Sequence, residues 1–174
     1  MRDFHFFWGH DRNRIGDKAV FSQWYPSTFV ADGITFPTAE HWMMYQKATL
    51  FGDDKIAYEM LQNPFPGPVK DLGRQVKGFN EEVWDREKVG IVRLGNILKF
   101  TQSGELEDIL LATGDTILVE ASPYDRIWGI GLSEKSPHAT DPSRWKGQNL
   151  LGYVLMDVRS IVRGETPTKL EDWT

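Results

Sequence analysis

The spacing of apolar and polar residues predicts a chain of helices with a few short strands between them. The longest regular pattern covers 80–100, where apolar residues recur every three or four positions behind Asn80, a residue type favoured as a helix N-cap. Thr38 is an equivalent N-cap for a helix over 39–50, and Gly52 is placed to end it. Further helices are predicted over 53–62, 69–77, 104–112 and 149–162.

Strand signals are fewer and shorter. Two apolar runs, at 29–30 and 34–36, flank Asp32-Gly33, a dipeptide that favours a tight hairpin turn. Apolar runs at 20–24 and 116–121 are predicted as two more strands. The whole pattern predicts an α+β fold, a predominantly helical single domain with a small β component.

Two polar segments interrupt these elements. The proline-rich stretch 63–68 is predicted to connect two helices, and 133–143 is predicted to be a surface loop of the kind that often covers a site. No repeat, low-complexity tract or linker is present. The predicted organisation is therefore one domain over 1–163, followed by a polar C-terminal tail over 164–174.

Composition and charge narrow the class of protein. Hydrophobic residues make up 40% and charged residues 26% of the 174 positions, as in ordinary soluble domains. The net charge of -5 argues against long nucleic acid as a general partner, because binding to a phosphate backbone needs the opposite sign. The absence of cysteine excludes disulfides and thiolate catalysis and suits a reducing compartment. Without a secretory leader pattern or an apolar run of about 20 residues, we expect a cytoplasmic protein that does not enter a membrane.

The first segment that could carry chemistry runs from Glu40 to Lys47. On a helix, these two residues lie seven positions apart, which returns them to one face about 20° out of register and about 10.5 Å apart along the axis. A carboxylate and an ammonium that bracket an apolar strip could hold a sugar between acid–base and electrostatic groups. The alternative is an ordinary surface helix with solvated charged residues.

The second segment, 120–131, follows an apolar strand-like run. It offers Asp125, Arg126 and Trp128 ahead of two closely spaced glycines, and carboxylates past a strand end beside an aromatic ring form a common type of site. In the alternative interpretation, Asp125 and Arg126 form a turn and Trp128 packs in the core. The residues leave both interpretations open.

Two further segments could bind an anion. Glycines and amides, among them Asn149, precede a predicted helix in 145–152, where free backbone N–H groups could hold a phosphate; the alternative is that Asn149 only caps the helix. Lys70 and Arg74 offer two cations to a phosphate, unless both are simply solvated. The four histidines lack paired metal-ligand spacing, so no metal and no cofactor are expected.

Taken in order, these segments resemble the NADAR superfamily, also called YbiA-like proteins. The resemblance extends from Phe4 to about Arg163. One position departs from the commonest family pattern, since many members carry Asn where this chain has Gln23. The matching motifs are Phe21–Pro26, Glu40-His41, Lys47-Ala48, Phe51–Asp53, Leu72–Arg74, Trp84, Lys99-Phe100, Leu111–Gly114, Glu120–Ser122, Tyr124–Gly131 and Trp145–Gly152.

The resemblance implies a hydrolase that cleaves the N-glycosidic bond between ribose and a nitrogen base. Cleavage builds positive charge at the anomeric carbon and negative charge on the departing nitrogen. We therefore expect Glu40 or Asp125 to act as the carboxylate. Lys47 would donate a proton or form an imine with the opened sugar. The expected substrate contacts are stacking of Trp24, Trp84 and Trp128 on the base, phosphate binding by Arg74 and Arg126, and an anion contact at Asn149.

The resemblance leaves three functions open. The first is hydrolysis of phosphorylated ribosylamino-pyrimidine intermediates of riboflavin biosynthesis, which the acidic charge favours. The second is removal of ADP-ribose from modified guanine in nucleic acid, the one case in which a long nucleic acid would be the substrate. The third is a non-catalytic module that binds ADP-ribose or a related nucleotide. The sequence does not indicate an oligomeric state.

Overall fold

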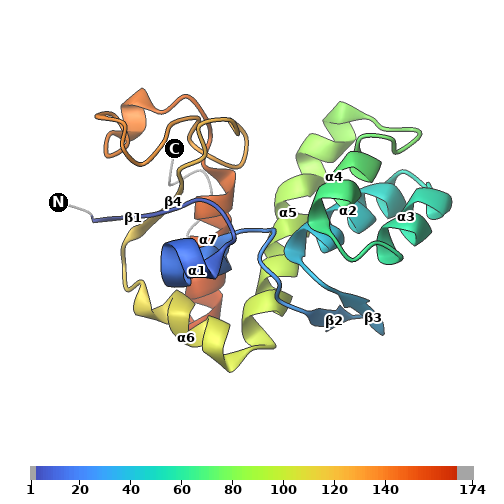
Figure 1. Ribbon diagram of the computed structural model, residues 1–174, viewed down its shortest axis with the longest axis horizontal. Coiled ribbons are helices and arrows are strands. Elements are labelled where there is room, and N and C mark those ends of the chain that lie inside the picture. Colours follow the sequence, from blue (N-terminus) through green and yellow to red (C-terminus); the bar gives the residue numbers. More distant parts are fainter. Residues whose placement is uncertain (1–2, 168–174) are drawn as a thin grey trace. The chain divides into compact units, whose positions relative to one another are not determined.

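The computed structural model describes residues 3–167, which form two compact units (Figure 1). The first unit contains residues 3–22 and 103–167, and the second contains residues 23–102. Helices dominate both units and the strands are short, so the predicted helix-rich α+β fold is confirmed. The predicted tail begins at Gly164, and its residues 168–174 lie outside the described part of the chain.

The first unit is built on a two-stranded parallel sheet. Strand β1 (Phe4–Phe7) pairs with β4 (Ile117–Glu120), so that Phe4 lies opposite Ile117. Helix α7 (Leu150–Val162) packs against β4 and is buried over most of its length (Figure 1). The remaining elements of this unit are helix α1 (Arg12–Ile15), the 3-10 helix η1 (Gly16–Phe21), helix α6 (Gly104–Ala112) and the 3-10 helix η2 (Pro142–Arg144).

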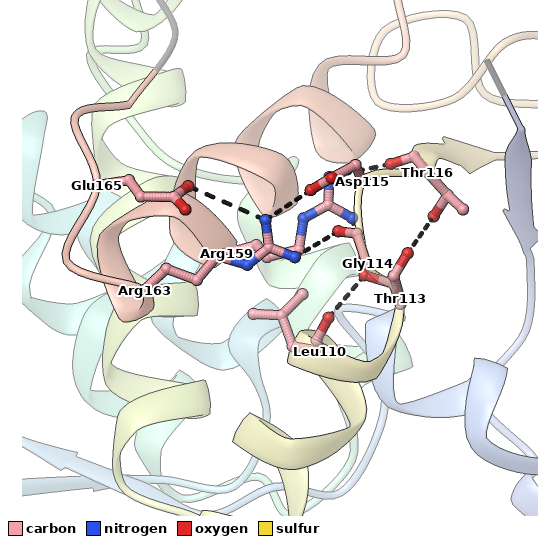
Figure 2. Close-up of polar contacts among 8 residues, drawn as sticks. All are labelled: Leu110, Thr113, Gly114, Asp115, Thr116, Arg159, Arg163 and Glu165. Carbon is pink, nitrogen blue, oxygen red and sulfur yellow. Dashed lines mark hydrogen bonds and ion pairs between the residues drawn. The ribbon is translucent and has the colours of Figure 1, made fainter. Parts of the chain in front are cut away.

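Two arginines at the C-terminal end of α7, Arg159 and Arg163, bind the turn that leads into β4 (Figure 2). Arg159, which is 5% exposed, donates to the Thr113 hydroxyl at 2.8 Å and to the Thr116 carbonyl at 3.0 Å. Arg163 donates to the Gly114 carbonyl at 2.6 Å and pairs with Asp115 at 2.8 Å. This network fixes the start of β4 against the helix that follows it in the chain.

The second unit is a helical cluster with one hairpin. Helix α2 (Ala39–Leu50) packs against α3 (Asp54–Leu61), α4 (Pro66–Gly73) and α5 (Glu81–Thr101). Strands β2 (Phe29–Ala31) and β3 (Ile34–Phe36) form an antiparallel hairpin. Its rings pack on the indole of Trp42, which is 5% exposed. The core of this unit therefore forms where the hairpin, α2 and α5 meet.

The caps and the turn that the sequence predicts are present. Thr38 accepts a hydrogen bond from the backbone N–H of His41 at 3.3 Å, and Asn80 accepts from that of Val83 at 3.0 Å. Both residues of the Asp32-Gly33 turn have positive φ angles, 49° and 77°, as a tight hairpin of this hand requires. Helices α2 and α5 and the hairpin thus follow from local signals.

Other predictions were wrong. Residues 20–24 are not a strand, because Ala19, Val20 and Phe21 are all buried at the end of the 3-10 helix η1, which no alternating strand pattern allows. The helix predicted over 69–77 starts earlier, at Pro66, because proline is well suited to the first helical position, and it ends at Gly73. Strand β1, helix α1 and the two 3-10 helices lacked a sequence signal long enough to be recognised.

Within residues 3–167, no helix is both long and apolar enough to cross a membrane. The longest one, α5, carries charged residues along its whole length.

Candidate functional site

Helix α2 carries both residues of the first candidate segment. Glu40 lies in its first turn and is 3% exposed, while Lys47 lies in its last turn and is partly exposed. The backbone N–H of Glu40 donates to the Gln23 carbonyl at 2.9 Å, which ties the start of the helix to the segment before the hairpin. The adjacent His41 ring is held at both nitrogens, at 2.8 Å from the Thr38 hydroxyl and 2.8 Å from the Asn63 carbonyl. The helix end that presents Glu40 is therefore fixed in place by its neighbours.

The Lys47 ammonium lies in a partly desolvated, aromatic environment. It donates to the Gly73 carbonyl at 2.8 Å and sits 4.4 Å from the ring centroid of Phe79 and 5.6 Å from that of Trp84. Burial lowers the pKa of Lys47 below its ordinary value, and the charge of Arg74 lowers it further. A lysine in such a setting gives up its proton more readily than a solvated one, either to a leaving group or to become a nucleophilic amine.

Three of the predicted binding residues surround this helix in the same unit. Trp84 and Arg74 are near Lys47, as described above, and Arg74 is also paired with Asp71. Trp24 is partly exposed, and the Lys70 ammonium lies 5.8 Å from its ring centroid. The structure therefore brings Lys47, Trp84 and Arg74 together and places Trp24 beside a separate cation.

The second candidate segment belongs to the other unit and forms a tight loop after β4. One carboxylate oxygen of Asp125 accepts from the backbone N–H groups of Ile127 and Trp128, each at 2.8 Å. The Ser122 hydroxyl accepts from the N–H groups of Tyr124 and Asp125, at 3.3 and 3.1 Å. Arg126 is exposed and Trp128 is partly exposed. Asp125 thus shapes the loop with one oxygen, and the loop presents an exposed guanidinium beside an indole.

Asn149 holds the same loop and strand from within. It is fully buried, its side-chain oxygen accepts from the N–H of Glu120, and its side-chain nitrogen donates to the carbonyl of Leu118, both at 3.0 Å. Its φ angle of 54° is left-handed, and its side chain makes no cap bond to α7. Asn149 is the N-cap residue of α7, as the alternative interpretation predicted, but its side chain makes no cap bond because the amide is engaged by β4. The predicted anion contact at this residue stays a prediction.

Comparison with known proteins decides the family. A model of the NADAR domain matches residues 6–163. The chain belongs to the NADAR family. The predicted relationship is thus confirmed over nearly the whole length on which the motifs were recognised.

Two relatives of this NADAR-family chain are named N-glycosidases, and one of them has a solved structure similar to this one. A protein of Acanthamoeba polyphaga mimivirus named N-glycosidase R617 is 43% identical over 159 residues, which cover 88% of this chain and 93% of that protein. The Escherichia coli protein YbiA, also named an N-glycosidase, is 33% identical over 144 residues, covering 83% of this chain and 79% of that one. Its NMR structure superposes with a TM-score of 0.76 and covers 94% of this chain and 86% of the other.

A maize relative is named for riboflavin biosynthesis and not as an N-glycosidase. The Riboflavin biosynthesis protein PYRR, chloroplastic, is 33% identical over 149 residues. The match covers 80% of this chain but only 22% of the maize protein. This NADAR-family chain therefore corresponds to a small part of that longer protein.

Sequence reasoning missed several aromatic residues near the candidate segments. Phe79, whose ring lies closest to the Lys47 ammonium, directly precedes the N-cap of α5 and belongs to no periodic pattern. Trp8 and Tyr124 form an exposed ring pair with centroids 6.0 Å apart, and Tyr124 is 85% exposed. The contact between Trp8 and Tyr124 joins residues far apart in the chain, so only the pairing of β1 with β4 could have revealed it.

Proposed function

We propose that this NADAR-family chain is an N-glycosidase that hydrolyses the ribosyl–nitrogen bond of phosphorylated ribosylamino-pyrimidine intermediates of riboflavin biosynthesis. The observation that carries the proposal is the partly desolvated Lys47 ammonium, held between a backbone carbonyl and two aromatic rings on the helix that also bears the buried Glu40. The names of the mimiviral and E. coli relatives support the bond that is cleaved. The name of the maize relative supports the pyrimidine substrate.

Glu40 is the carboxylate that we assign to the reacting ribose. A carboxylate can stabilise the positive charge that develops at the anomeric carbon, or it can take a proton from the attacking water. Glu40 is buried on a helix whose first turn is held by Thr38, Gln23 and Asn63, so its backbone is pre-positioned. Asp125 remains the other candidate carboxylate, although one of its oxygens already holds its own loop.

Lys47 has two possible roles, and its lowered pKa favours both. As an acid, the ammonium protonates the departing ring or exocyclic nitrogen, and water adds to the anomeric carbon. As a nucleophile, the neutral amine attacks C1 of the ring-opened N-glycoside, which is an imine with the base nitrogen. The C1–base bond breaks, the base leaves with a proton, and Lys47 is left as an imine that water hydrolyses to the sugar and the free amine. In both roles the base leaves with one added proton and the sugar gains a hydroxyl.

The aromatic rings and cations supply the substrate contacts. Trp84, which lies beside Lys47, is assigned to stacking on the base, and the same role for Trp24 and for Trp128 stays a prediction. Arg74 and Arg126 are both exposed, so each can reach a phosphate oxygen without the cost of breaking a buried contact. Asn149 is the weakest of the assigned contacts because its amide is occupied by β4.

The proposal is tested by incubating the purified chain with a phosphorylated ribosylamino-pyrimidine and measuring the released base and ribose phosphate by mass spectrometry. Glu40→Gln and Lys47→Ala should each lower kcat by about 100- to 10,000-fold, the usual contribution of an acid–base group. Lys55→Ala is the matched control, since the Lys55 side chain is 84% exposed. A Lys47→Ala variant that releases ribose at the rate of the control removes Lys47 from the mechanism.

Borohydride reduction during turnover separates the two roles of Lys47. An imine would be reduced to a stable secondary amine, and a peptide containing Lys47 would then be heavier by the mass of ribose phosphate less one oxygen atom. If the enzyme turns over at full rate and Lys47 stays unmodified, the acid role is the correct one.

A second candidate function is removal of ADP-ribose from modified guanine, and the exposed Trp8–Tyr124 pair is the observation that favours it. An ADP-ribosylated base has a second nucleobase, and exposed aromatic rings are the usual stacking surface for one. Tyr124→Ala should then raise KM about tenfold for an ADP-ribosylated oligonucleotide, the magnitude expected from loss of one stacked base. An unchanged KM for that substrate, or no turnover of it at all, would leave the pyrimidine reaction as the only proposed activity.

A further inference from the structure

A cavity in the first unit is lined by none of the residues assigned to the proposed reaction. It has a volume of about 260 Å³ and is lined by residues from β1, η1 and α6 with the turn that follows. Phe21, Ile109 and Ala112 provide apolar walls, and His5 and Lys18 provide ionisable groups. The remaining lining residues, Asp17 and Thr113, are already engaged by arginines.

His5 contributes a buried nitrogen that lacks a partner. Its Nε2 atom is inaccessible to solvent and has no hydrogen-bond partner within residues 3–167. The ring is held in place by an edge-on contact with Phe21, with centroids 5.4 Å apart. Because a buried polar atom without a partner costs free energy, His5 would be stabilised by a group that accepts a hydrogen bond from Nε2.

The charges around His5 favour an anion as that group. Burial lowers the pKa of His5, and the positive charges of Lys18 and Arg159 lower it further. Asp17 does not offset them, because Arg12 binds its carboxylate through two nitrogens at 3.0 and 2.7 Å. Among residues 3–167, the Lys18 ammonium pairs with Glu134 at a distance of 3.5 Å.

Arg159 is fixed behind the cavity wall. Figure 2 shows its guanidinium directed at the turn, where it donates to the Thr113 hydroxyl at 2.8 Å. The Thr113 hydroxyl in turn donates to the Leu110 carbonyl at 2.6 Å, so it is not available to a ligand. The positive charge next to His5 is therefore a permanent feature of the unit.

We propose that this cavity is a second ligand site, which binds a small organic anion with an apolar body. The anionic end of the ligand would face Lys18 and the His5 ring, and the apolar body would pack on Phe21 and Ile109. Because Nε2 is inaccessible to solvent, the His5 ring would have to turn toward the cavity to donate a hydrogen bond to the ligand. The bound anion favours the protonated ring, so binding is accompanied by uptake of a proton at His5. The site is independent of the proposed glycosidase reaction, whose assigned residues do not line it.

Benzoate is a suitable probe, because it combines a carboxylate with an apolar ring of a size that fits the volume. The full chain is labelled with ¹³C and ¹⁵N, and the ring signals of its histidines are followed by NMR as benzoate, or inorganic phosphate in a parallel series, is added. We expect saturable shifts of the His5 signals with benzoate, a rise in the pKa of His5, and weaker binding of phosphate, which has no apolar body.

Variants separate a built site from weak surface binding. His5→Phe keeps the ring contact with Phe21 but removes the nitrogen, and it should weaken benzoate binding about 10- to 100-fold, the usual effect of losing a hydrogen bond to a charged group. Lys18→Gln, at a partly exposed residue, should weaken it in the same direction without affecting the fold. His138→Gln, in an exposed loop, is the matched control and should bind as the parent does.

Three results would overturn the proposal. The first is a benzoate titration that does not saturate at His5. The second is unchanged affinity in both His5→Phe and Lys18→Gln. The third is phosphate binding as tight as that of benzoate, which would exclude a role for the apolar walls. If His5→Phe does not fold, the Lys18→Gln titration decides the matter by itself.

Discussion

Gly95 on helix α5 faces the Trp42 indole of α2, and Gly95→Ala is the clearest test of the packing that supports Glu40 and Lys47. A Cβ atom at Gly95 would lie 2.3 Å from Cδ1 and 2.8 Å from Nε1 of Trp42. The indole cannot move easily, because its N–H donates to the Ile91 carbonyl at 2.8 Å and its ring packs edge-on against Phe36 at 5.3 Å. The added methyl group must therefore displace either the indole or the whole helix.

The expected magnitude follows from three contributions. Forcing an extra carbon into a packed core costs about 1–3 kcal/mol. Loss of the indole hydrogen bond adds about 1 kcal/mol, and the better helix propensity of alanine returns about 1 kcal/mol. Gly95→Ala should therefore lower the free energy of unfolding by about 1–3 kcal/mol, and each kcal/mol lowers Tm by about 2–4 °C for a chain of this length.

Gly90 provides the matched control on the same helix. It is exposed, and a Cβ atom there meets nothing within 4 Å, so Gly90→Ala should raise the free energy of unfolding by about 0.5–1 kcal/mol. Both variants are compared with the parent by urea and thermal denaturation. If Gly95→Ala is as stable as the parent, or if the two substitutions shift stability in the same direction, the close contact between α2 and α5 is wrong.

Three further predictions concern stability. Asn149→Ala leaves a buried N–H and a buried carbonyl of β4 without partners and should destabilise the chain by about 2–4 kcal/mol in urea denaturation, whereas an effect below about 0.5 kcal/mol would mean that β4 does not depend on this amide. Thr113→Val removes a partner of the buried Arg159 guanidinium and should lower Tm with a loss of about 1–3 kcal/mol; an unchanged Tm would contradict the bond. Burial lowers the pKa of His41 below its ordinary value of 6.5. Between the pKa of the folded chain and 6.5, the unfolded chain therefore binds more protons than the folded chain. The free energy of unfolding should rise with pH over that interval. The rise should be smaller in His41→Gln, and an equal slope in the two proteins would refute this cause.

The elements that the sequence predicted well are those specified by local signals. Helix α5 combines a long 3.6-residue periodicity with an N-cap at Asn80, and the hairpin turn needs the two positive φ angles that Asp32-Gly33 readily adopts. Strand β1 is four residues long, is not an alternating pattern, and pairs with a strand more than half the chain away. A parallel pair of this kind is stabilised by α7 and η1 packing on it, and such tertiary contacts leave no local signature.

The candidate site, like the fold, could be predicted from the sequence only in part. The seven-residue spacing of Glu40 and Lys47 predicts their common helix face from the sequence alone, and the structure contains that helix. The chemistry of Lys47, however, depends on the Gly73 carbonyl and the Phe79 ring, which are supplied by α4 and by the residue ahead of the α5 cap. The sequence could therefore indicate which residues carry charge, but not that burial lowers the pKa of one of them.

Gln23 shows how a departure from the family pattern can be explained by packing. Its side-chain amide donates to the Asn96 oxygen at 3.0 Å and accepts from the Asn96 nitrogen at 3.2 Å, and both residues are buried. An asparagine at this position would be one methylene shorter and would have to move its backbone to keep both bonds with Asn96. The backbone carbonyl of Gln23 accepts a hydrogen bond from the N–H of Glu40 at the start of α2. The longer side chain therefore allows Gln23 to keep both this backbone bond and its amide pair with Asn96. The longer side chain of Gln23 thus reaches Asn96 on α5 while the Gln23 backbone carbonyl accepts the N–H of Glu40.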